Sequence, residues 1–214
     1  MLEDSLVRLI KTILTIHDGL EKRWLEYLSE IGLELVNFNS VKVYEILENK
    51  ELEKYIYEYI SFMNKHTIYV TACLDYTIID RTRVKERLSI DQKIDSYCNR
   101  AERGRVIIHK CLNDLYGIRV VMESSIDCDT LVQELKRIFP EKVKITNATK
   151  KEGYKGVHVY TPAIKGHFKW ELQIWDRESY INNINLHESH KRRYISDLRK
   201  AALAEKGDVK NVYP

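Results

Sequence analysis

The sequence predicts an α+β fold, in which a mixed β-sheet is flanked by helices and preceded by a helical N-terminal segment. Apolar residues recur at three- and four-residue steps up to about residue 65, as they do in amphipathic helices. Further along the chain, short runs alternate apolar and polar residues, which is typical of half-buried strands. Strands and helices that follow one another in this way are expected to pack in layers, with helices against a sheet.

The composition is that of one compact domain spanning residues 1–214. Hydrophobic residues make up 44% of the chain, and three prolines and eight glycines leave no low-complexity linker. The four cysteines lie far apart without a C-x-x-C pair, which argues against a zinc cluster or a disulfide framework. Neither a signal peptide nor a membrane span is indicated, so we expect a cytoplasmic protein with no membrane partner.

Charge is distributed unevenly along the chain. Residues 1–66 contain 8 Lys and Arg against 12 Asp and Glu, whereas residues 81–111 contain 9 against 4. The second segment therefore predicts a positive surface that binds an anion. The alternative is a solvated helix face, which is the usual role of such a charge run.

The segment 1–66 is predicted to be a helical scaffold. Gly19 and Gly32 are expected to separate its helices, and a third helix is predicted from Ser40 to Met63. An aromatic stripe on that helix indicates a core face: Tyr55, Tyr59 and Phe62. Residues 66–79 are ambiguous, because β-branched residues favour a strand and continuity favours a helix. We predict a strand only from Tyr76 to Val84.

Residues 80–94 contain a group of cations at spacings that indicate a shared site. Arg83 and Lys85 lie on one face of a strand, because side chains alternate with a period of two. Ser89 is placed to cap a helix that carries Lys93 in its first turn. A helix N-terminus surrounded by cations suits a polyphosphate.

An arginine lies inside the next predicted strand, Leu115–Val121. Asp114 stands at the start of this strand and Arg119 within it. A guanidinium in an apolar strand needs a partner, so Arg119 is either paired structurally with an acidic residue or part of a functional site. A helix over residues 127–139 and an edge strand from Lys142 to Thr149 are predicted to follow.

The last predicted feature is a hairpin with polar residues on one face. A turn at Gly153–Gly156 leads into the strand Val157–Tyr160, and a second strand is predicted at Trp170–Trp175. The period of two places Glu171 and Gln173 on one face of the second strand and its aliphatic residues on the other. An isolated strand of this kind would simply turn its polar face to water.

In this order and spacing, four motifs resemble the synthetase domain of RelA/SpoT-type proteins, and the chain length resembles that of their small single-domain members. The motifs are Arg83-x-Lys85 with Ser89 and Lys93; Asp114-x-x-Gly117-Ile118-Arg119; Gly153-Tyr154-Lys155-x-x-His158; and Glu171-Leu172-Gln173-Ile174. The resemblance implies a nucleotidyltransferase-like fold. It divides the chain into the helical segment 1–66, a catalytic core at 76–195 and a basic C-terminal tail at 196–214.

The resemblance implies a diphosphotransferase that moves pyrophosphate from ATP to a ribose 3′-hydroxyl with the help of Mg²⁺. Hard magnesium prefers carboxylates, for which Asp114 and Glu171 are the candidates. Glu171 would also accept the proton of the hydroxyl. The implied catalytic residues are Asp114, Glu171, Arg119 and Gln173. The residues expected to bind ATP are Arg83, Lys85, Ser89, Lys93 and Arg119.

The acceptor would lie beside Tyr154, whose ring can stack on a base, and beside Lys155 and His158. Alarmone-making members usually continue the motif Glu-Ile-Gln-Ile with Arg-Thr, whereas this chain has Trp175 and Asp176 after Ile174. The segment that follows is basic, and its candidate acceptor-binding residues are His190, Lys191, Arg192 and Arg193. These traits resemble the toxic branch of the family, which pyrophosphorylates the 3′-CCA end of tRNA and inhibits translation.

Three functions are compatible with the sequence. The first is a pyrophosphokinase that acts on tRNA as the toxin of a toxin–antitoxin pair, with an antitoxin protein as its partner. The second is a (p)ppGpp synthetase that uses GDP or GTP. The third is an inactive nucleotide- or RNA-binding module, against which the presence of both Asp114 and Glu171 argues. The sequence leaves the acceptor and the formation of a homo-oligomer open.

Overall fold

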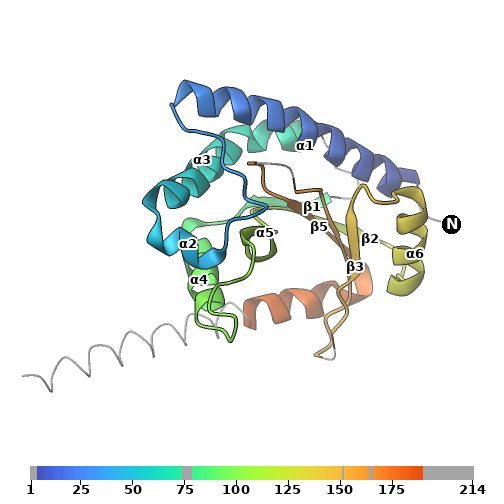
Figure 1. Cartoon of the computed structure of the whole chain (residues 1–214). Helices are drawn as coiled ribbons and strands as arrows, with labels where there is room; N and C mark the ends of the chain where they lie inside the picture. The colour runs from blue at the N-terminus through green and yellow to red at the C-terminus, as the bar shows by residue number, and fades with distance from the viewer. Residues whose placement is uncertain (1–3, 74–78, 151, 164–165, 190–214) are drawn as a thin grey trace, which may run out of the picture.

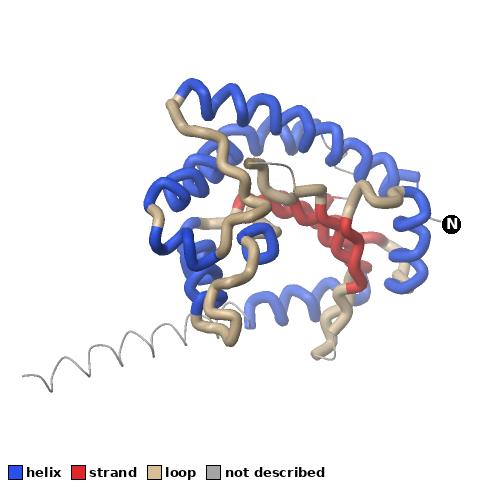
Figure 2. The backbone as a smooth tube through the Cα atoms, in the orientation of Figure 1, coloured by secondary structure: helices blue, strands red, loops and turns tan. Residues whose placement is uncertain are grey.

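The computed structural model describes residues 4–73, 79–150, 152–163 and 166–189 (Figure 1). Its centre is a five-stranded mixed sheet with helices around it, which confirms the predicted α+β class (Figure 2). The strand order is β1-β2-β5-β4-β3, with β2 and β5 parallel and the other neighbours antiparallel. The last strand in the sequence therefore lies in the middle of the sheet.

The strands are β1 (Ile79–Val84), β2 (Tyr116–Met122), β3 (Lys144–Asn147), β4 (Val157–Tyr160) and β5 (Trp170–Asp176). The named helices are α1 (Asp4–Glu30), α2 (Val43–Glu48), α3 (Lys50–Cys73), α4 (Arg87–Cys98), α5 (Ile108–Cys111) and α6 (Cys128–Ile138). Residues 177–189 form a further helix. None of the helices in the described part of the chain is long and apolar enough to span a membrane.

The acidic N-terminal segment covers one face of the sheet. In the view of Figure 1, α1 lies on one side of the sheet and the helix of residues 177–189 on the other. Ile10 and Ile13 of α1 are buried and line a small apolar space together with Ile118 of β2 and Leu172 of β5. The period of two that turns Leu172 toward α1 therefore turns its neighbours Glu171 and Gln173 to the opposite face.

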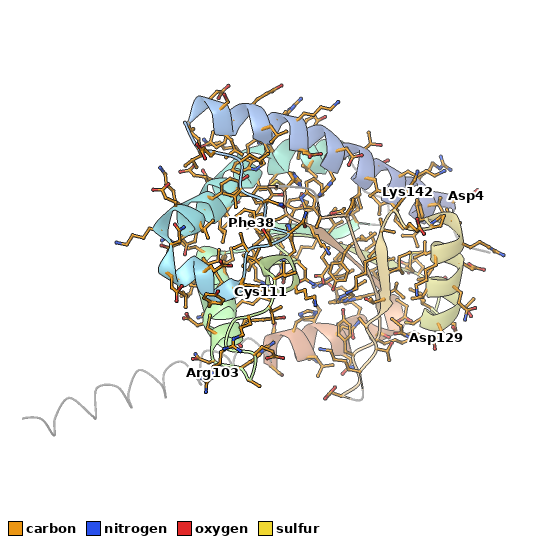
Figure 3. The ribbon with its side chains drawn as sticks, in the orientation of Figure 1. Asp4, Phe38, Arg103, Cys111, Asp129 and Lys142 are labelled. Carbon is orange, nitrogen blue, oxygen red and sulfur yellow. The ribbon has the colours of Figure 1, made fainter. Side chains whose placement is uncertain are left out.

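The predicted aromatic stripe forms the centre of the core. Trp24 is fully buried, and its indole N–H donates to the hydroxyl of Tyr55 at 3.1 Å and to the carbonyl of Gly166 at 2.8 Å. Gly166 has a φ of +74°, and a Cβ there would lie 2.3 Å from Leu35 Cδ1, so only glycine fits. Phe38, labelled in Figure 3, is buried with its ring 5.0 Å from that of Tyr55.

Three predicted helix boundaries were wrong. Helix α1 continues through Gly19, because its packed apolar face outweighs the cost of about 1 kcal/mol for glycine in a helix. The predicted third helix is two helices that are separated at Asn49, whose side chain accepts hydrogen bonds from the backbone N–H groups of Glu51 and Leu52. Helix α3 then runs on to Cys73, so continuity prevails over β-branching there. Residues 76–78 of the predicted strand Tyr76–Val84 lie outside the described residues, and its remainder is β1.

Three histidines are buried in the core around Phe168. His17 and His167 are fully buried, and Nε2 of His17 lies 3.1 Å from Nδ1 of His167. His109 packs its ring 5.5 Å from that of Phe168, and neither of its ring nitrogens has a hydrogen-bond partner among the described residues. Burial lowers the pKa of all three histidines, and that of His109 falls to about 4.

We expect the free energy of unfolding to decrease as the pH falls from about 6.5 toward 4. The pKa of His109 is lower in the folded chain than in the unfolded chain, so the unfolded state binds more protons in this window and is favoured. For His109 alone, the shift to about 4 corresponds to roughly 3 kcal/mol. His109→Phe, which keeps a flat ring, should reduce the pH dependence in urea unfolding between about pH 6.5 and 4, and the part that stays comes from His17 and His167. Equal pH dependence in the variant and the wild type would contradict this expectation.

Candidate functional site

The face of the sheet turned away from α1 carries two rows of side chains that cross several strands. Strand register aligns Arg81, Arg119, Gln173 and His158 in one row. It aligns Arg83, Gly117, Glu171 and Tyr160 in the next. All seven residues of β5 are buried, so its polar face does not simply turn to water. The rows bring residues from four separate sequence motifs onto one surface, and a pocket on it is lined by the three arginines.

The first carboxylate of the site, Asp114, lies between two lysines. Lys85 Nζ is 2.6 Å from its Oδ2, and Lys93 Nζ is 2.9 Å from its Oδ1. Lys93 also donates to the side-chain oxygen of Asn113 at 3.2 Å. Burial alone would raise the pKa of Asp114, but the two ammonium charges outweigh it and lower this pKa to about 2. Asp114 is therefore ionised at neutral pH.

The predicted cap at Ser89 was wrong. Helix α4 begins at Arg87 with Glu86 as its N-cap residue, so Ser89 lies within the first turn and Lys93 beyond it. The backbone N–H of Lys85 is already held by the carbonyl of Leu115, and the chain turns into the helix directly after this contact. Lys93 still points to the site, because the helix carries its amine to Asp114.

The second carboxylate, Glu171, is held by three neighbouring side chains. Its Oε1 accepts a hydrogen bond from the hydroxyl of Tyr160 at 2.9 Å and lies 3.1 Å from Nδ1 of His158. Its Oε2 accepts from the amide of Gln173 at 2.8 Å. Burial favours a higher pKa for Glu171, but the contacts with His158 and Tyr160 prevail and lower it. Glu171 is thus an ionised, oriented carboxylate 6% exposed to solvent.

Arg119 is paired with an acidic residue and also contacts other polar and aromatic side chains of the site. Its Nε and Nη2 donate to the side-chain oxygen of Gln173 at 3.2 and 3.1 Å. Its Nη1 lies 3.7 Å from the carboxylate of Asp80, and its guanidinium lies over the ring of Trp175 at 3.7 Å from the ring centroid. Gln173 therefore connects Arg119 to Glu171, so the three side chains form a continuous buried network.

The ring of Tyr154 is covered, which differs from the open stacking platform that we predicted. Tyr154 is 8% exposed, and its ring meets those of His158, Trp175 and His187 edge to face. Its hydroxyl lies 2.6 Å from Nε2 of His158 and accepts from the indole N–H of Trp175 at 2.8 Å. Stacking of an acceptor base on this ring stays a prediction, and it requires His187 on the helix of residues 177–189 to move aside.

Lys155 is bound to groups around the end of β5. Its Nζ lies 2.7 Å from Oδ2 of Asp176, whose side chain is 1% exposed. The side chain of Asn183 accepts from the backbone N–H of Lys155 and donates to its carbonyl. Asp176 also accepts from the backbone N–H of Ser179 and so caps the helix of residues 177–189. Burial would raise the pKa of Asp176, but these contacts, that with Lys155 first, lower it to about 2.

Several residues of the site were missed by sequence reasoning. Tyr160 stands two residues after His158, so the alternation of the strand could have placed it on the same face. Asp80 pairs with Arg119 and accepts a hydrogen bond from the hydroxyl of Tyr180. Asn182 donates to the carbonyl of Gly153. The contact of Asn182 depends on where the helix of residues 177–189 packs, and no local sequence pattern predicts this position. The predicted residues His190, Lys191, Arg192 and Arg193 lie outside the described residues.

The two carboxylates fit a magnesium ion that is shared with a bound polyphosphate. No group of three or more His, Cys, Asp or Glu side chains in the described segments could hold a metal. Magnesium needs only one or two carboxylates when phosphate oxygens and waters supply its other ligands. Asp114 and Glu171 are both ionised, as this mode requires, and magnesium would displace a lysine amine from Asp114 when it binds.

A family model described as "Region found in RelA / SpoT proteins" matches residues 82–197 of the chain. The comparison with curated proteins gave no match. Among solved structures, the chain is similar to small alarmone synthetase 1 from Bacillus subtilis, with 19% identity, 77% of this chain and 100% of that chain covered, and a TM-score of 0.37.

Two further solved structures are similar to this chain. Small alarmone synthetase 2 from Bacillus subtilis has 21% identity, covers 75% of this chain and 94% of its own, and has a TM-score of 0.32. Small alarmone synthetase 1 from Bacillus subtilis bound to AMPCPP has 17% identity and a TM-score of 0.35. The match covers 77% of this chain and 100% of that chain. The match over residues 82–197 includes every site residue in the rows except Arg81.

Proposed function

The chain belongs to the RelA/SpoT family, and from this premise we propose that it is a pyrophosphokinase that transfers pyrophosphate from ATP to a ribose 3′-hydroxyl. One observation carries the proposal. The ionised carboxylate of Glu171 shares a face of the sheet with Arg83 and Arg119, and the ionised carboxylate of Asp114, held by two lysines, is near enough to act on the pKa of Glu171. A site that transfers a charged phosphoryl group needs this combination of carboxylates and cations.

On the donor side, the cations hold and neutralise the phosphates of ATP. Arg83 and Arg119 lie on neighbouring strands, with Gly117 between Arg83 and Glu171 in the row. Because glycine has no side chain, the side chain of Arg83 lies across Gly117, 3.6 Å from where a Cβ would be, and it lines a pocket together with Arg119. Magnesium bound with ATP would be held by Asp114 and Glu171, and it supplies charge neutralisation at the transferred group. Lys85 and Lys93 keep Asp114 ionised and oriented.

On the acceptor side, Glu171 is the group that receives the proton. Its ionised carboxylate accepts a hydrogen bond from the 3′-hydroxyl and takes the proton as the new bond from oxygen to the β-phosphorus forms. The bond between the β-phosphorus and the bridging oxygen breaks at the same centre, and AMP leaves with the electron pair. His158 and Tyr160 keep the carboxylate in one orientation through Oε1.

We further propose that the acceptor is the 3′ end of tRNA and that the protein inhibits translation as the toxin of a toxin–antitoxin pair. Lys155, the cation expected beside the acceptor, is already paired with the buried carboxylate of Asp176. Its charge is therefore largely balanced before any substrate binds, which disfavours an acceptor whose own polyphosphate must be held there. The terminal nucleoside of an RNA brings no such polyphosphate, and its backbone phosphates lie further away.

The direct test is to incubate the protein with ATP labelled at the β- and γ-phosphates and with bulk tRNA, GDP or GTP. Label in tRNA, removed by nuclease digestion of the RNA, supports the proposal. Label in (p)ppGpp with unlabelled tRNA replaces the proposed acceptor by guanosine nucleotides and leaves the pyrophosphokinase chemistry in place. If the protein is folded and ATP stays intact with all three acceptors, the proposed reaction itself is refuted.

Neutralising Lys191, Arg192 and Arg193 together should weaken tRNA modification strongly at moderate salt, because only a large acceptor needs cations outside the catalytic motifs. Each lost phosphate contact should reduce the slope of log K against log salt by roughly 0.7 to 0.9. A matched control neutralises the three exposed cations Arg8, Lys11 and Lys22 of α1, which lie away from the site. If both triple variants modify tRNA with the salt dependence of the wild type, the basic segment does not bind the acceptor.

A further inference from the structure

On the premise of the proposed function, we propose that Trp175 is a positioning residue that links the donor side of the site to the acceptor side. Its side chain is fully buried on the same face of β5 as Glu171 and Gln173. One part of the indole holds the arginine that we place beside ATP, and another part holds the far end of a chain of hydrogen bonds that ends at Glu171. The substitution of this tryptophan should therefore affect both substrates, through two separable contacts.

The donor-side contact is with Arg119. The guanidinium carbon lies 3.7 Å from the ring centroid of Trp175, within the range of a cation–π interaction. Arg119 is 8% exposed, so this interaction is little weakened by water. Together with the two hydrogen bonds to Gln173, the indole leaves the guanidinium a single position above the sheet. A fixed guanidinium can bind phosphate oxygens without being reordered during the reaction.

The acceptor-side contact is the hydrogen bond from the indole N–H to the hydroxyl of Tyr154 at 2.8 Å. An indole N–H can only donate, so the oxygen of Tyr154 must accept. The tyrosine proton is then directed to Nε2 of His158, 2.6 Å away. A neutral His158 that accepts at Nε2 carries its proton on Nδ1, which lies 3.1 Å from Oε1 of Glu171. The ionised carboxylate can only accept, so Glu171 requires the same tautomer, and Trp175 holds the hydroxyl of Tyr154 at the other end of the chain in the matching direction.

Gly156 shows that the loop is shaped around this indole. A Cβ on Gly156 would lie 2.8 Å from Cδ1 of Trp175 and 3.0 Å from the carbonyl oxygen of Ile174, so the backbone approaches the ring more closely than any other residue allows. The glycine that ends the Gly-Tyr-Lys-Gly loop therefore makes room for the tryptophan. The same loop presents Tyr154 and Lys155, so the ring also fixes the loop that faces the acceptor.

Two substitutions separate the contacts. Trp175→Phe keeps a ring over Arg119 and removes the N–H, so kcat/KM for the acceptor should fall about fivefold while KM for ATP stays within about twofold. Trp175→Leu removes the ring as well, so KM for ATP should also rise, by about tenfold. The matched control is Trp170→Phe on the other face of β5, whose N–H donates to Tyr59; it should lower the melting temperature and leave both KM values unchanged.

A second readout does not depend on turnover. The nitrogen chemical shifts of a histidine ring in the nuclear magnetic resonance spectrum show which nitrogen carries the proton and how strong a hydrogen bond the other accepts. We expect Nδ1 of His158 to carry the proton in the wild type and in both variants, because it faces the carboxylate of Glu171. In Trp175→Phe alone, the hydroxyl of Tyr154 loses the indole N–H, so the shift of Nε2 should move toward that of a nitrogen that accepts a weaker hydrogen bond. An unchanged Nε2 shift in Trp175→Phe, or equal changes in the KM values for ATP and acceptor, would overturn the positioning role. A wild type that transfers no pyrophosphate, with the expected Nε2 shift in Trp175→Phe, would refute the proposed function alone.

Discussion

Glu171→Gln is expected to lower the rate of pyrophosphate transfer by about a thousandfold or more, in a protein that remains folded. The substitution keeps the size of the side chain and its ability to contact Tyr160, but it removes the negative charge. The variant can neither take the proton of the 3′-hydroxyl nor hold magnesium as a charged ligand. General base catalysis contributes about 10²- to 10⁴-fold by itself, and the loss of a metal ligand adds to it. The measurement is the initial rate with labelled ATP at saturating acceptor.

Asp114→Asn should cause a loss of the same order, because the site then has one carboxylate against the two ammonium groups that now face it. The matched control is Glu26→Gln, the same chemical change on the exposed side of α1. Circular dichroism of all three variants checks that they are folded. A rate within tenfold of the wild type for either site variant would refute the assignment of the two carboxylates.

Arg119→Lys is expected to reduce kcat/KM for ATP by about a hundredfold, although the charge is kept. Lysine is a point charge on a flexible chain, so it cannot donate twice to Gln173 while it also faces a phosphate. Removal of one well-placed donor to the developing charge costs about 10²- to 10³-fold in other enzymes. The matched control is Arg177→Lys, in which the exposed arginine pairs with Glu123 at the surface. A loss of less than tenfold would show that charge alone suffices at this position.

The sequence predicted those parts of the fold and site that depend on local pattern. The alternation at β5 placed Glu171 and Gln173 on one face, and the stripe of Tyr55 and Tyr59 identified the core side of α3. Contacts between distant segments could not be predicted, because they depend on strand order and register. The pairing of Arg119 with Gln173 arises only because β2 lies beside β5 in parallel, a choice that neither strand encodes by itself.

The predicted helix boundaries were wrong for a related reason. The cap was predicted at Ser89 because serine is preferred at helix starts. Helix α4 begins earlier, at Arg87, directly beyond the end of β1, which is paired with β2 as far as Val84. At Ser89, tertiary packing prevails over a local preference that amounts to about 1 kcal/mol. The covering of Tyr154 could not be predicted either, because it depends on the helix of residues 177–189, which brings His187 against the ring.

The central position of β5 has a consequence for the order in which the protein matures during synthesis. The strand is made after the other four, yet it must be inserted between β2 and β4, which until then have unpaired edges. N-terminal segments leave the ribosome first, so the scaffold and the arginines of β1 and β2 are present before Glu171 exists. A nascent chain that ends before β5 therefore lacks the carboxylate to which we assign proton transfer, and its site is incomplete. Translation of its own message must pass Asp176 before any molecule of this protein can act.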